Sequence, residues 1–454
     1  MKVIGIIAEY NPFHSGHAYQ LQKAHELFGE DTAIVAVMSG NFVQRGEPAI
    51  ASKWTRTQAA LHCGVDLVIE IPFTYACASA ERFAQGAVSL LQATGIVTDL
   101  YFGSECIDLS LLTILAGILS EESLPYTLLL KANLKDGHSY AKARELALTS
   151  YLVTIGSSEI AEKCGALLKM PNSILALEYL IALKKSGSRI KPSVLLRSGA
   201  GYHDTSMASE NVSASAIRNT VTKSAVKGVF SVSQLAGQLA GMMPPESLSA
   251  LLSEWSNGIR PVLAADFIPE TILALRSHTT AHLDELAYMG DQVSHRLKNA
   301  VAGLRNCSKE ELPESFRALS DTRRYAGTRI NRALISLLLG QTSADLTSLS
   351  APQYLRILGF SERGRYLLRL MKKTAVLPQI DKTSDFLEYG QNEKLTRMAE
   401  LDLLSTDLWD LKAGYIYGDE YERSVIRIKG NRNIAGARSL LLNGFLPSKT
   451  NLSL

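Results

Sequence analysis

Two histidines stand close together near the start of the chain, in the segment His14-Ser15-Gly16-His17. Imidazole donates hydrogen bonds to phosphate oxygens and can carry a positive charge near neutral pH. Gly16 lets the backbone come close to a bound group, because glycine has no Cβ atom. A helix that begins here would add its free N–H groups and the positive end of its dipole. The segment therefore predicts a cradle for the phosphates of a nucleotide.

From the residues alone, the histidine pair is also compatible with a structural or incidental role. It could equally bind zinc, although only Glu9 stands nearby as a third ligand. We assign no metal ligand. The location favours phosphate, because residues 2–8 form a short apolar run that predicts a buried strand ending just before the loop. Open α/β sheets bind their ligands at the carboxyl ends of strands.

The elements expected to position this loop alternate between strands and helices. Helical spacing follows the loop to about Phe28 and returns at residues 53–63 and 81–95. Short apolar runs predict further strands at residues 33–38, 66–72, 100–103, 126–130 and 192–197. This alternation predicts an α/β fold with a Rossmann-like parallel sheet.

The second half of the chain has a different pattern, with few strand-like runs after about Val229. Helical spacing covers residues 248–255, 281–305, 329–339, 362–373 and 393–411. We expect a nucleotide-binding domain at residues 1–240 and a mainly α-helical domain at residues 241–454. The extension after about residue 412 matches no pattern, and residues 421–429 fit either a strand or a helix.

Composition limits the classes of protein that fit. The 454 residues exceed one ordinary domain, and 46% apolar with 20% charged residues is typical of a soluble globular protein. The net charge of +3 means that a nucleic-acid site must come from local clustering of cations. Five cysteines without a CxxC pair indicate reduced thiols and a cytoplasmic protein. We expect neither a signal peptide nor a membrane span.

Several cations stand where they could contact an anionic ligand. Arg197 ends a predicted strand, and Arg218 lies in the first turn of a helix that Ser213 or Ser215 could cap. Lys53 and Arg56 lie near a predicted helix start, where they could contact a triphosphate or an RNA backbone. A solvated helix start accounts for Lys53 and Arg56 equally well.

A second cluster of arginines lies in the helical half. Arg323 and Arg324 are followed by Tyr325, and Arg329 and Arg332 stand one turn apart on a predicted helix. Basic residues with an interleaved aromatic are typical of RNA-binding surfaces. A solvated helix face is the alternative.

These segments together resemble a known group of enzymes. A strand followed by the HxGH loop, with a late Ser213–Arg218 segment, is similar to the nucleotidyltransferase superfamily. More narrowly, the chain resembles the bacterial tRNA(Met) cytidine acetate ligase family. The blocks that carry this resemblance are Glu9-Tyr10-Asn11-Pro12-Phe13-His14-Ser15-Gly16-His17 and residues 38–48, 64–72, 102–105, 171–175, 202–204, 322–325 and 356–360.

The resemblance implies a two-step reaction. ATP activates acetate to acetyl-adenylate with release of pyrophosphate, and the acetyl group then passes to N4 of the wobble cytidine of elongator tRNA(Met). His14 and His17 would stabilise adenylyl transfer, with Mg²⁺ as the counter-ion of ATP. The expected ATP-binding residues are Ile7, Ala8, Glu9, Tyr10, Asn11, Pro12, Phe13, His14, Ser15, Gly16, His17, Ala18, Tyr19, Gln20, Gly103, Asn172, Arg197 and Arg218. The expected RNA-binding residues are Lys53, Arg56, Arg323, Arg324, Arg329 and Arg332.

Two further functions remain as alternatives. A small-molecule adenylyltransferase of cofactor biosynthesis would use the same opening loop. A non-catalytic RNA-binding protein could keep such a fold without the reaction. The long helical half with its arginines favours a macromolecular substrate, and the presence of both histidines and Arg218 favours an enzyme.

Overall fold

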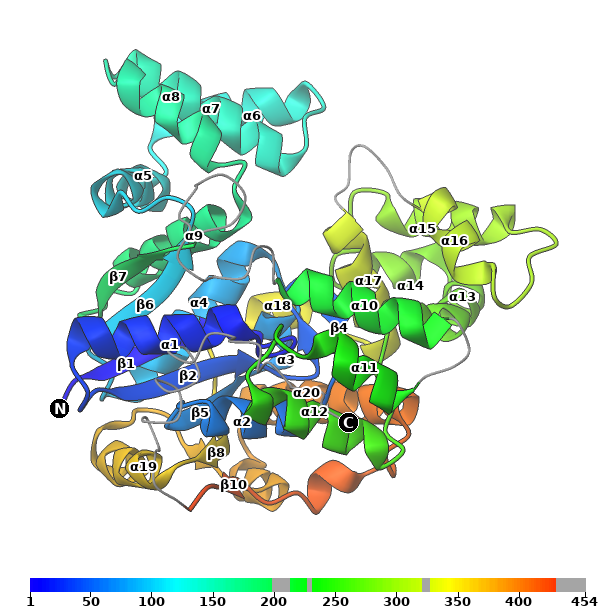
Figure 1. The fold of residues 1–454 in the computed structure, drawn as a ribbon. Helices are drawn as coiled ribbons and strands as arrows, with labels where there is room; N and C mark the ends of the chain where they lie inside the picture. Colours follow the sequence, from blue (N-terminus) through cyan, green and yellow to red (C-terminus); the bar gives the residue numbers. More distant parts are fainter. Residues whose placement is uncertain (198–212, 227–230, 321–326, 430–454) are drawn as a thin grey trace, which may run out of the picture.

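The structure is a computed structural model that describes residues 1–197, 213–226, 231–320 and 327–429 (Figure 1). Its centre is an eight-stranded sheet with the order β10-β8-β5-β2-β1-β6-β7, in which β9 also pairs with β8. The strands are β1 Val3–Ala8, β2 Ala33–Ser39, β5 Leu67–Ile71, β6 Asp99–Ser104, β7 Lys191–Leu196, β8 Leu355–Phe360, β9 Gln379–Ile380 and β10 Ile426–Arg427. A separate hairpin joins β3 Phe42–Val43 to β4 Glu47–Pro48.

The α/β prediction is confirmed, and strands β1, β2, β5, β6 and β7 all run parallel. Most of these strands are buried apolar runs, and β2 is buried at every position. Because parallel strands end at one edge, the carboxyl ends of β1, β2, β6 and β7 lie at the same edge of the sheet.

One predicted strand is wrong. Residues 126–130 lie within helix α6, Leu124–Lys135. The apolar run Leu128-Leu129-Leu130 contains no β-branched residue. Leucine is among the strongest helix formers, so an apolar run of leucines alone does not indicate a strand.

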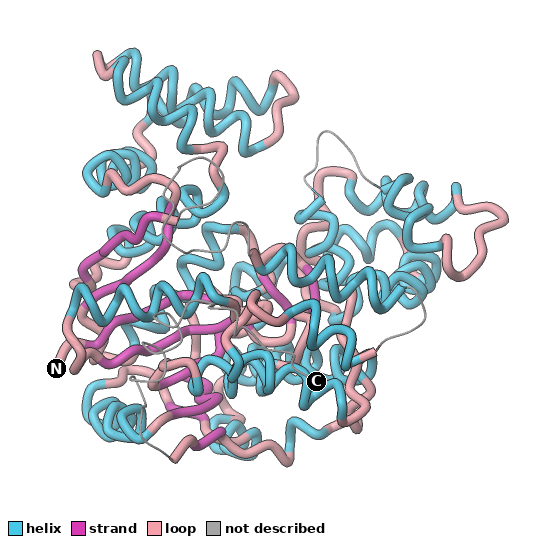
Figure 2. The backbone as a smooth tube through the Cα atoms, in the orientation of Figure 1, coloured by secondary structure: helices cyan, strands magenta, loops and turns pink. Residues whose placement is uncertain are grey.

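Helices cover both faces of the sheet (Figure 2). Helices α1 Ser15–Phe28 and α2 Lys53–His62 share one apolar core with strand residues of the sheet, and α4 Ala80–Ala93 and α9 Pro171–Lys185 share the other. Between β6 and β7 the chain forms an arm that projects at the top of Figure 1. The arm comprises α5 Leu109–Glu121, α6, α7 Tyr140–Thr154 and α8 Ser158–Leu167.

The part of the chain after residue 240 is mainly helical, as expected. Its main helices are α12 Pro245–Ser256, α13 Ile268–Ser277, α14 Thr280–Glu285, α15 Val293–Gly303, α16 Leu312–Ser320, α17 Gly327–Leu339, α19 Glu362–Thr374 and α20 Glu393–Ala413. The segment expected to be helical at 281–305 is broken between α14 and α15. There, Tyr288, Asp291 and Gln292 have positive φ angles, which an α-helix does not accept.

The two halves share one sheet, which the sequence pattern did not indicate. Strand β8 pairs antiparallel with β5, and β10 pairs parallel with β8. The strands on both sides of residue 240 are therefore hydrogen-bonded to one another. Residues 421–429 contain the strand β10. No single helix in the described ranges is long and apolar enough to cross a membrane, and α8 with α9 passes that test only as a pair bent by 116°.

Candidate active site at the carboxyl edge of the sheet

The HxGH loop forms the first turn of α1 and orients both imidazoles. His14 is the N-cap residue, and its Nδ1 accepts a hydrogen bond from the backbone N–H of Gly16 at 3.0 Å. His17 Nδ1 accepts from the backbone N–H of His14 at 3.2 Å, and the two ring centroids are 4.0 Å apart. With Nδ1 as an acceptor in each ring, the neutral imidazole carries its proton on Nε2. Both histidines can therefore donate to an anion above the loop.

The surroundings of both histidines favour the neutral imidazole in the unliganded site. Burial, with Arg197 and Arg218 nearby, lowers the pKa of His14 to about 4. Burial, His14 and Arg197 likewise lower the pKa of His17 well below its ordinary value. At neutral pH both rings are neutral donors, and a bound polyanion would favour their protonated form.

Three chain segments meet beside the histidines, from the end of β6, the start of α9 and the end of β7. Arg197 Nη1 donates to Asn172 Oδ1 at 3.0 Å, and Asn172 Nδ2 donates to Glu105 Oε1 at 2.6 Å. A Cβ atom on Gly103 would lie 2.8 Å from Arg197 Cγ, so the glycine lets the arginine lie across the strand end. Burial raises the pKa of Glu105, but hydrogen bonds from Asn172 and Ser173 outweigh it and lower that pKa. The carboxylate therefore holds Asn172 in place.

Arg218 reaches the same loop from helix α10, Ala214–Val226. Its Nη1 donates to the backbone oxygen of Asn11 at 3.0 Å and its Nη2 to Ser215 Oγ at 3.2 Å. Among the residues that the structure describes, no carboxylate lies within ion-pair distance of Arg197 or Arg218. The two histidines, Asn172 and the two arginines thus converge as a group of donors and cations, in which neither arginine has an ion-pair partner within the described structure.

The prediction that Arg56 contacts RNA is wrong, because this arginine is buried with only 1% of its surface exposed. Its guanidinium donates to the backbone oxygens of Glu9 at 2.7 Å and Ser39 at 3.0 Å, and to that of Gly40. These carbonyls lie where β1 and β2 end. Arg56 therefore ties together the two strand ends from which the HxGH loop and the next loop begin.

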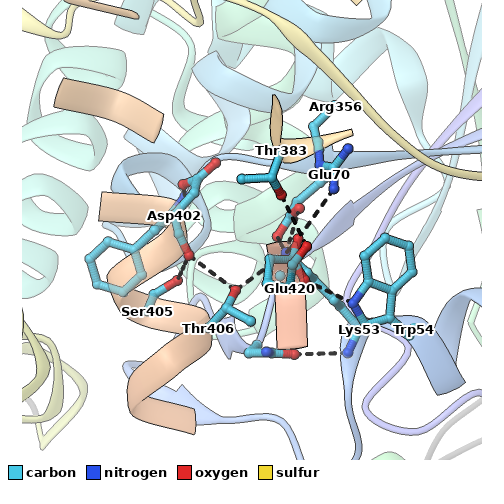
Figure 3. Close-up of polar contacts among 12 residues, drawn as sticks. Lys53, Trp54, Glu70, Arg356, Thr383, Asp402, Ser405, Thr406 and Glu420 are labelled. Carbon is cyan, nitrogen blue, oxygen red and sulfur yellow. Dashed lines mark hydrogen bonds and ion pairs between the residues drawn. The ribbon is translucent and has the colours of Figure 1, made fainter. Parts of the chain in front are cut away.

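Lys53 is also buried, so its predicted contact with RNA is wrong. Its Nζ lies 2.9 Å from Glu70 Oε2 and 3.0 Å from Glu420 Oε1 (Figure 3). Arg356 Nη2 lies 3.3 Å from the same oxygen of Glu420, and Trp54 Nε1 donates to Glu420 Oε2 at 2.9 Å. We call Lys53, Glu70, Arg356 and Glu420 the buried ion network.

Glu420 is a residue that sequence reasoning missed. It lies in the extension after residue 412, which matched no pattern, yet it is 2% exposed. Part of the extension therefore belongs to the core. A lone glutamate in an unpatterned segment gave no signal, because its partners lie far away in the sequence.

Of the predicted arginine cluster, Arg323 and Arg324 lie outside the described residues. Arg332 is 8% exposed, donates to the backbone oxygen of Gln44 at 3.2 Å and stacks over Tyr288. Its predicted contact with RNA is therefore wrong as well. Arg329 is partly exposed, forms an ion pair with Asp291 at 2.9 Å and donates to the backbone oxygen of Gly290 at 3.0 Å. The described ranges contain no group of three or more His, Cys, Asp and Glu that could hold a metal ion.

The parallel sheet and the HxGH loop define a nucleotidyltransferase, and residues 1–422 match the family described as HIGH Nucleotidyl Transferase. A tRNA(Met) cytidine acetate ligase of Acetivibrio thermocellus is 42% identical over 414 residues, which are 90% of this chain and 94% of that protein. One of Thermoanaerobacter sp. is 41% identical over 432 residues, 94% of this chain and 100% of that protein.

The fold is also similar to that of a solved relative. The crystal structure of Thermotoga maritima TmcAL bound with alpha-thio ATP has a TM-score of 0.82 and 30% identity, covering 95% of this chain and 100% of that chain. With the curated relatives, this similarity shows that the chain belongs to the tRNA(Met) cytidine acetate ligase family.

Proposed function

We propose that this protein activates acetate with ATP and transfers the acetyl group to N4 of the wobble cytidine of elongator tRNA(Met). The observation that carries the proposal is the convergence of His14, His17, Arg197 and Arg218 at one end of the sheet without a carboxylate partner for either arginine in the described structure. The names of its relatives supply the tRNA substrate.

In the first step, the site binds two anions and brings them together. Acetate is ionised at neutral pH, so its attack on the α-phosphate needs no general base. The N–H groups at the start of α1 and the Nε2–H groups of His14 and His17 stabilise charge on the phosphates. Arg197 and Arg218 contact the polyphosphate, and Ile7, Ala8, residues 10–20, Gly103 and Asn172 complete the ATP site. Mg²⁺ bound to the phosphates would neutralise further charge.

In the second step, a cytosine amine must reach the carbonyl carbon of the mixed anhydride. Anticodon bases are single-stranded and can be turned into a pocket, which a base in a duplex cannot. For contact with the tRNA backbone we propose Arg323 and Arg324. Arg323→Ala with Arg324→Ala should weaken tRNA binding and reduce its dependence on salt, as measured by filter binding at several salt concentrations. Unchanged binding would contradict this assignment.

The test of the whole proposal is ATP–pyrophosphate exchange with acetate, followed by acetyl transfer to tRNA. Exchange that depends on acetate, and labelled acetyl groups on elongator tRNA(Met) but not on initiator tRNA(Met), are the expected results. Exchange that ignores acetate and responds to a nucleotide or a vitamin phosphate would instead support a small-molecule adenylyltransferase.

A further inference from the structure

Glu9 is a carboxylate at the carboxyl end of β1. The family resemblance places it among the expected ATP-binding residues, but the adenylation step gives its carboxylate no role. Its Oε1 accepts a hydrogen bond from the backbone N–H of Gln44 at 2.9 Å. Its backbone oxygen accepts from Arg56 at 2.7 Å. Within the described structure, Oε2 has no hydrogen-bond donor. The residue is thus fixed at two atoms and has one oxygen available to a ligand.

The hairpin that holds Glu9 is itself held firmly. Gln44 donates through Nε2 to the backbone oxygen of Ala78 at 3.1 Å and accepts at its own backbone oxygen from Arg332. A Cβ atom on Gly46 would lie 2.4 Å from the backbone nitrogen of Arg332, so the turn packs directly on α17. The position of the Glu9 carboxylate is therefore set by the fold and not by an exposed loop.

The charge of Glu9 does not suit contact with ATP. A carboxylate beside a triphosphate repels it, whereas His14, His17, Arg197 and Arg218 are neutral or positive donors. A carboxylate does suit a cytosine, because its oxygens accept hydrogen bonds from the N4 amine. Glu9 stands five residues before His14, beside the loop where the acetyl-adenylate would form.

We propose that Glu9 accepts a hydrogen bond from the N4 amine of the wobble cytidine and takes its proton during acetyl transfer. This inference rests on the proposed function. In the step, a bond forms between N4 and the acetyl carbon, and the bond from that carbon to the phosphate oxygen breaks. AMP leaves with the electron pair, and one N4 proton moves to Glu9.

The charged groups around Glu9 are consistent with a base. The pKa of Glu9 is raised, mainly by burial and to a small extent by Glu47. The Gln44 N–H group, Arg218 and Arg45 lower it but do not outweigh burial. Arg56 and Tyr179 also face it, from α2 and α9. A carboxylate with a raised pKa is a stronger base once it is ionised. The first step needs no base, so the two steps should respond differently to loss of this group.

The test compares both steps in the Glu9→Gln variant of the full-length protein. Single-turnover acetyl transfer to tRNA should fall by about 10²- to 10⁴-fold, the usual effect of losing a general base. Acetate-dependent ATP–pyrophosphate exchange should fall far less. The acidic limb of the pH profile for transfer should disappear in Glu9→Gln, and Glu9→Asp should recover part of the rate.

Glu47→Gln is the matched control, because it removes a carboxylate from the hairpin that holds Glu9 and should leave transfer within a few-fold of the wild type. Equal losses of exchange and transfer in Glu9→Gln would overturn the inference, since Glu9 would then serve ATP binding or folding. Transfer at the wild-type rate would overturn it too. A wild-type protein without acetate-dependent exchange would contradict the proposed function, which is a different outcome.

Discussion

Two groups of cations in this protein have opposite surroundings. At the carboxyl edge of the sheet, Arg197 and Arg218 bond to amide, carbonyl and hydroxyl oxygens. In the buried ion network, Lys53 and Arg356 each meet a carboxylate (Figure 3). A cation that already has an acid partner has little to offer an anionic ligand. The acid partner, and not the position at a helix start or a strand end, distinguishes these two groups of cations.

The two groups also differ in what the fold requires of them. The network buries charged groups, and the loss of their hydration costs free energy unless each charge is paired. Burial raises the pKa of Glu420, but Lys53 and Arg356 outweigh it and hold that pKa below its usual value. In the candidate active site, the positive charge of Arg197 and Arg218 has no acid partner within the described structure and is left for an anionic ligand to neutralise. Loss of one charge should therefore affect stability in the network and activity in the site.

The largest effect on stability is expected from the network. Glu420→Gln leaves the positive charges of Lys53 and Arg356 facing Glu70 alone and should lower the free energy of unfolding by about 3–5 kcal/mol. Urea unfolding of the variant measures this. The exposed neighbour gives the control, because Glu422→Gln should change stability by less than about 0.5 kcal/mol. Equal unfolding midpoints for the two variants would show that the network is not stabilising.

The next effect is expected in the site and on the rate. His14→Asn should reduce acetate-dependent exchange by about 10²- to 10³-fold, because it removes a donor to the developing phosphate charge. Asparagine is a good N-cap residue, so the first turn of α1 should survive with a small change in melting temperature. His62→Asn, on the exposed end of α2, is the control. A large drop in melting temperature with unchanged exchange would assign His14 a structural role.

A pair of arginine variants tests the comparison directly. Arg197→Met should weaken ATP binding by about 10- to 100-fold, since a hydrogen bond to a charged group contributes roughly 1.5–3 kcal/mol. Its stability should change little, because the arginine is exposed and bonds to one amide oxygen. Arg356→Met should lower stability and leave ATP binding nearly unchanged. Calorimetric titration with ATP and thermal unfolding of both variants separate the two roles. Equal changes in ATP affinity and in melting temperature for the two variants would contradict the comparison.

Much of the fold and the centre of the site could be predicted from local sequence. The apolar run of β1, the glycine of the loop and the histidine spacing lie within about one strand and one turn of helix, where periodicity is informative. The burial of Lys53 could not be predicted, because its ion-pair partners come from β5 and the far end of the chain. Trp54 and Glu420, which bond to each other, are 366 residues apart.

Contacts between distant segments also explain why the sequence did not predict the shared sheet or the burial of Arg332. In the sequence, strand β8 is an isolated apolar run within a helical half. Only its pairing with β5 in the structure identifies it as part of the sheet. The sequence pattern around Arg332 predicts an exposed cation, because its contacts with Gln44 and Tyr288 join segments that are far apart in the sequence. Local patterns report which residues can form an element, whereas pairing between distant elements decides whether a charged side chain lies inside or outside.

The smallest effect concerns the response of the site to pH. Because the pKa of His14 is about 4 in the folded protein and about 6.5 when unfolded, the unfolded chain binds a proton in this range that the folded chain does not. Stability should fall as the pH drops from 7 to 5.5, with His14 contributing about 1 kcal/mol. Urea unfolding at both pH values should show a smaller loss for His14→Asn than for the wild type. The same loss in both would mean that His14 is already charged in the free site, and the contrast between neutral histidines and permanent cations would not hold.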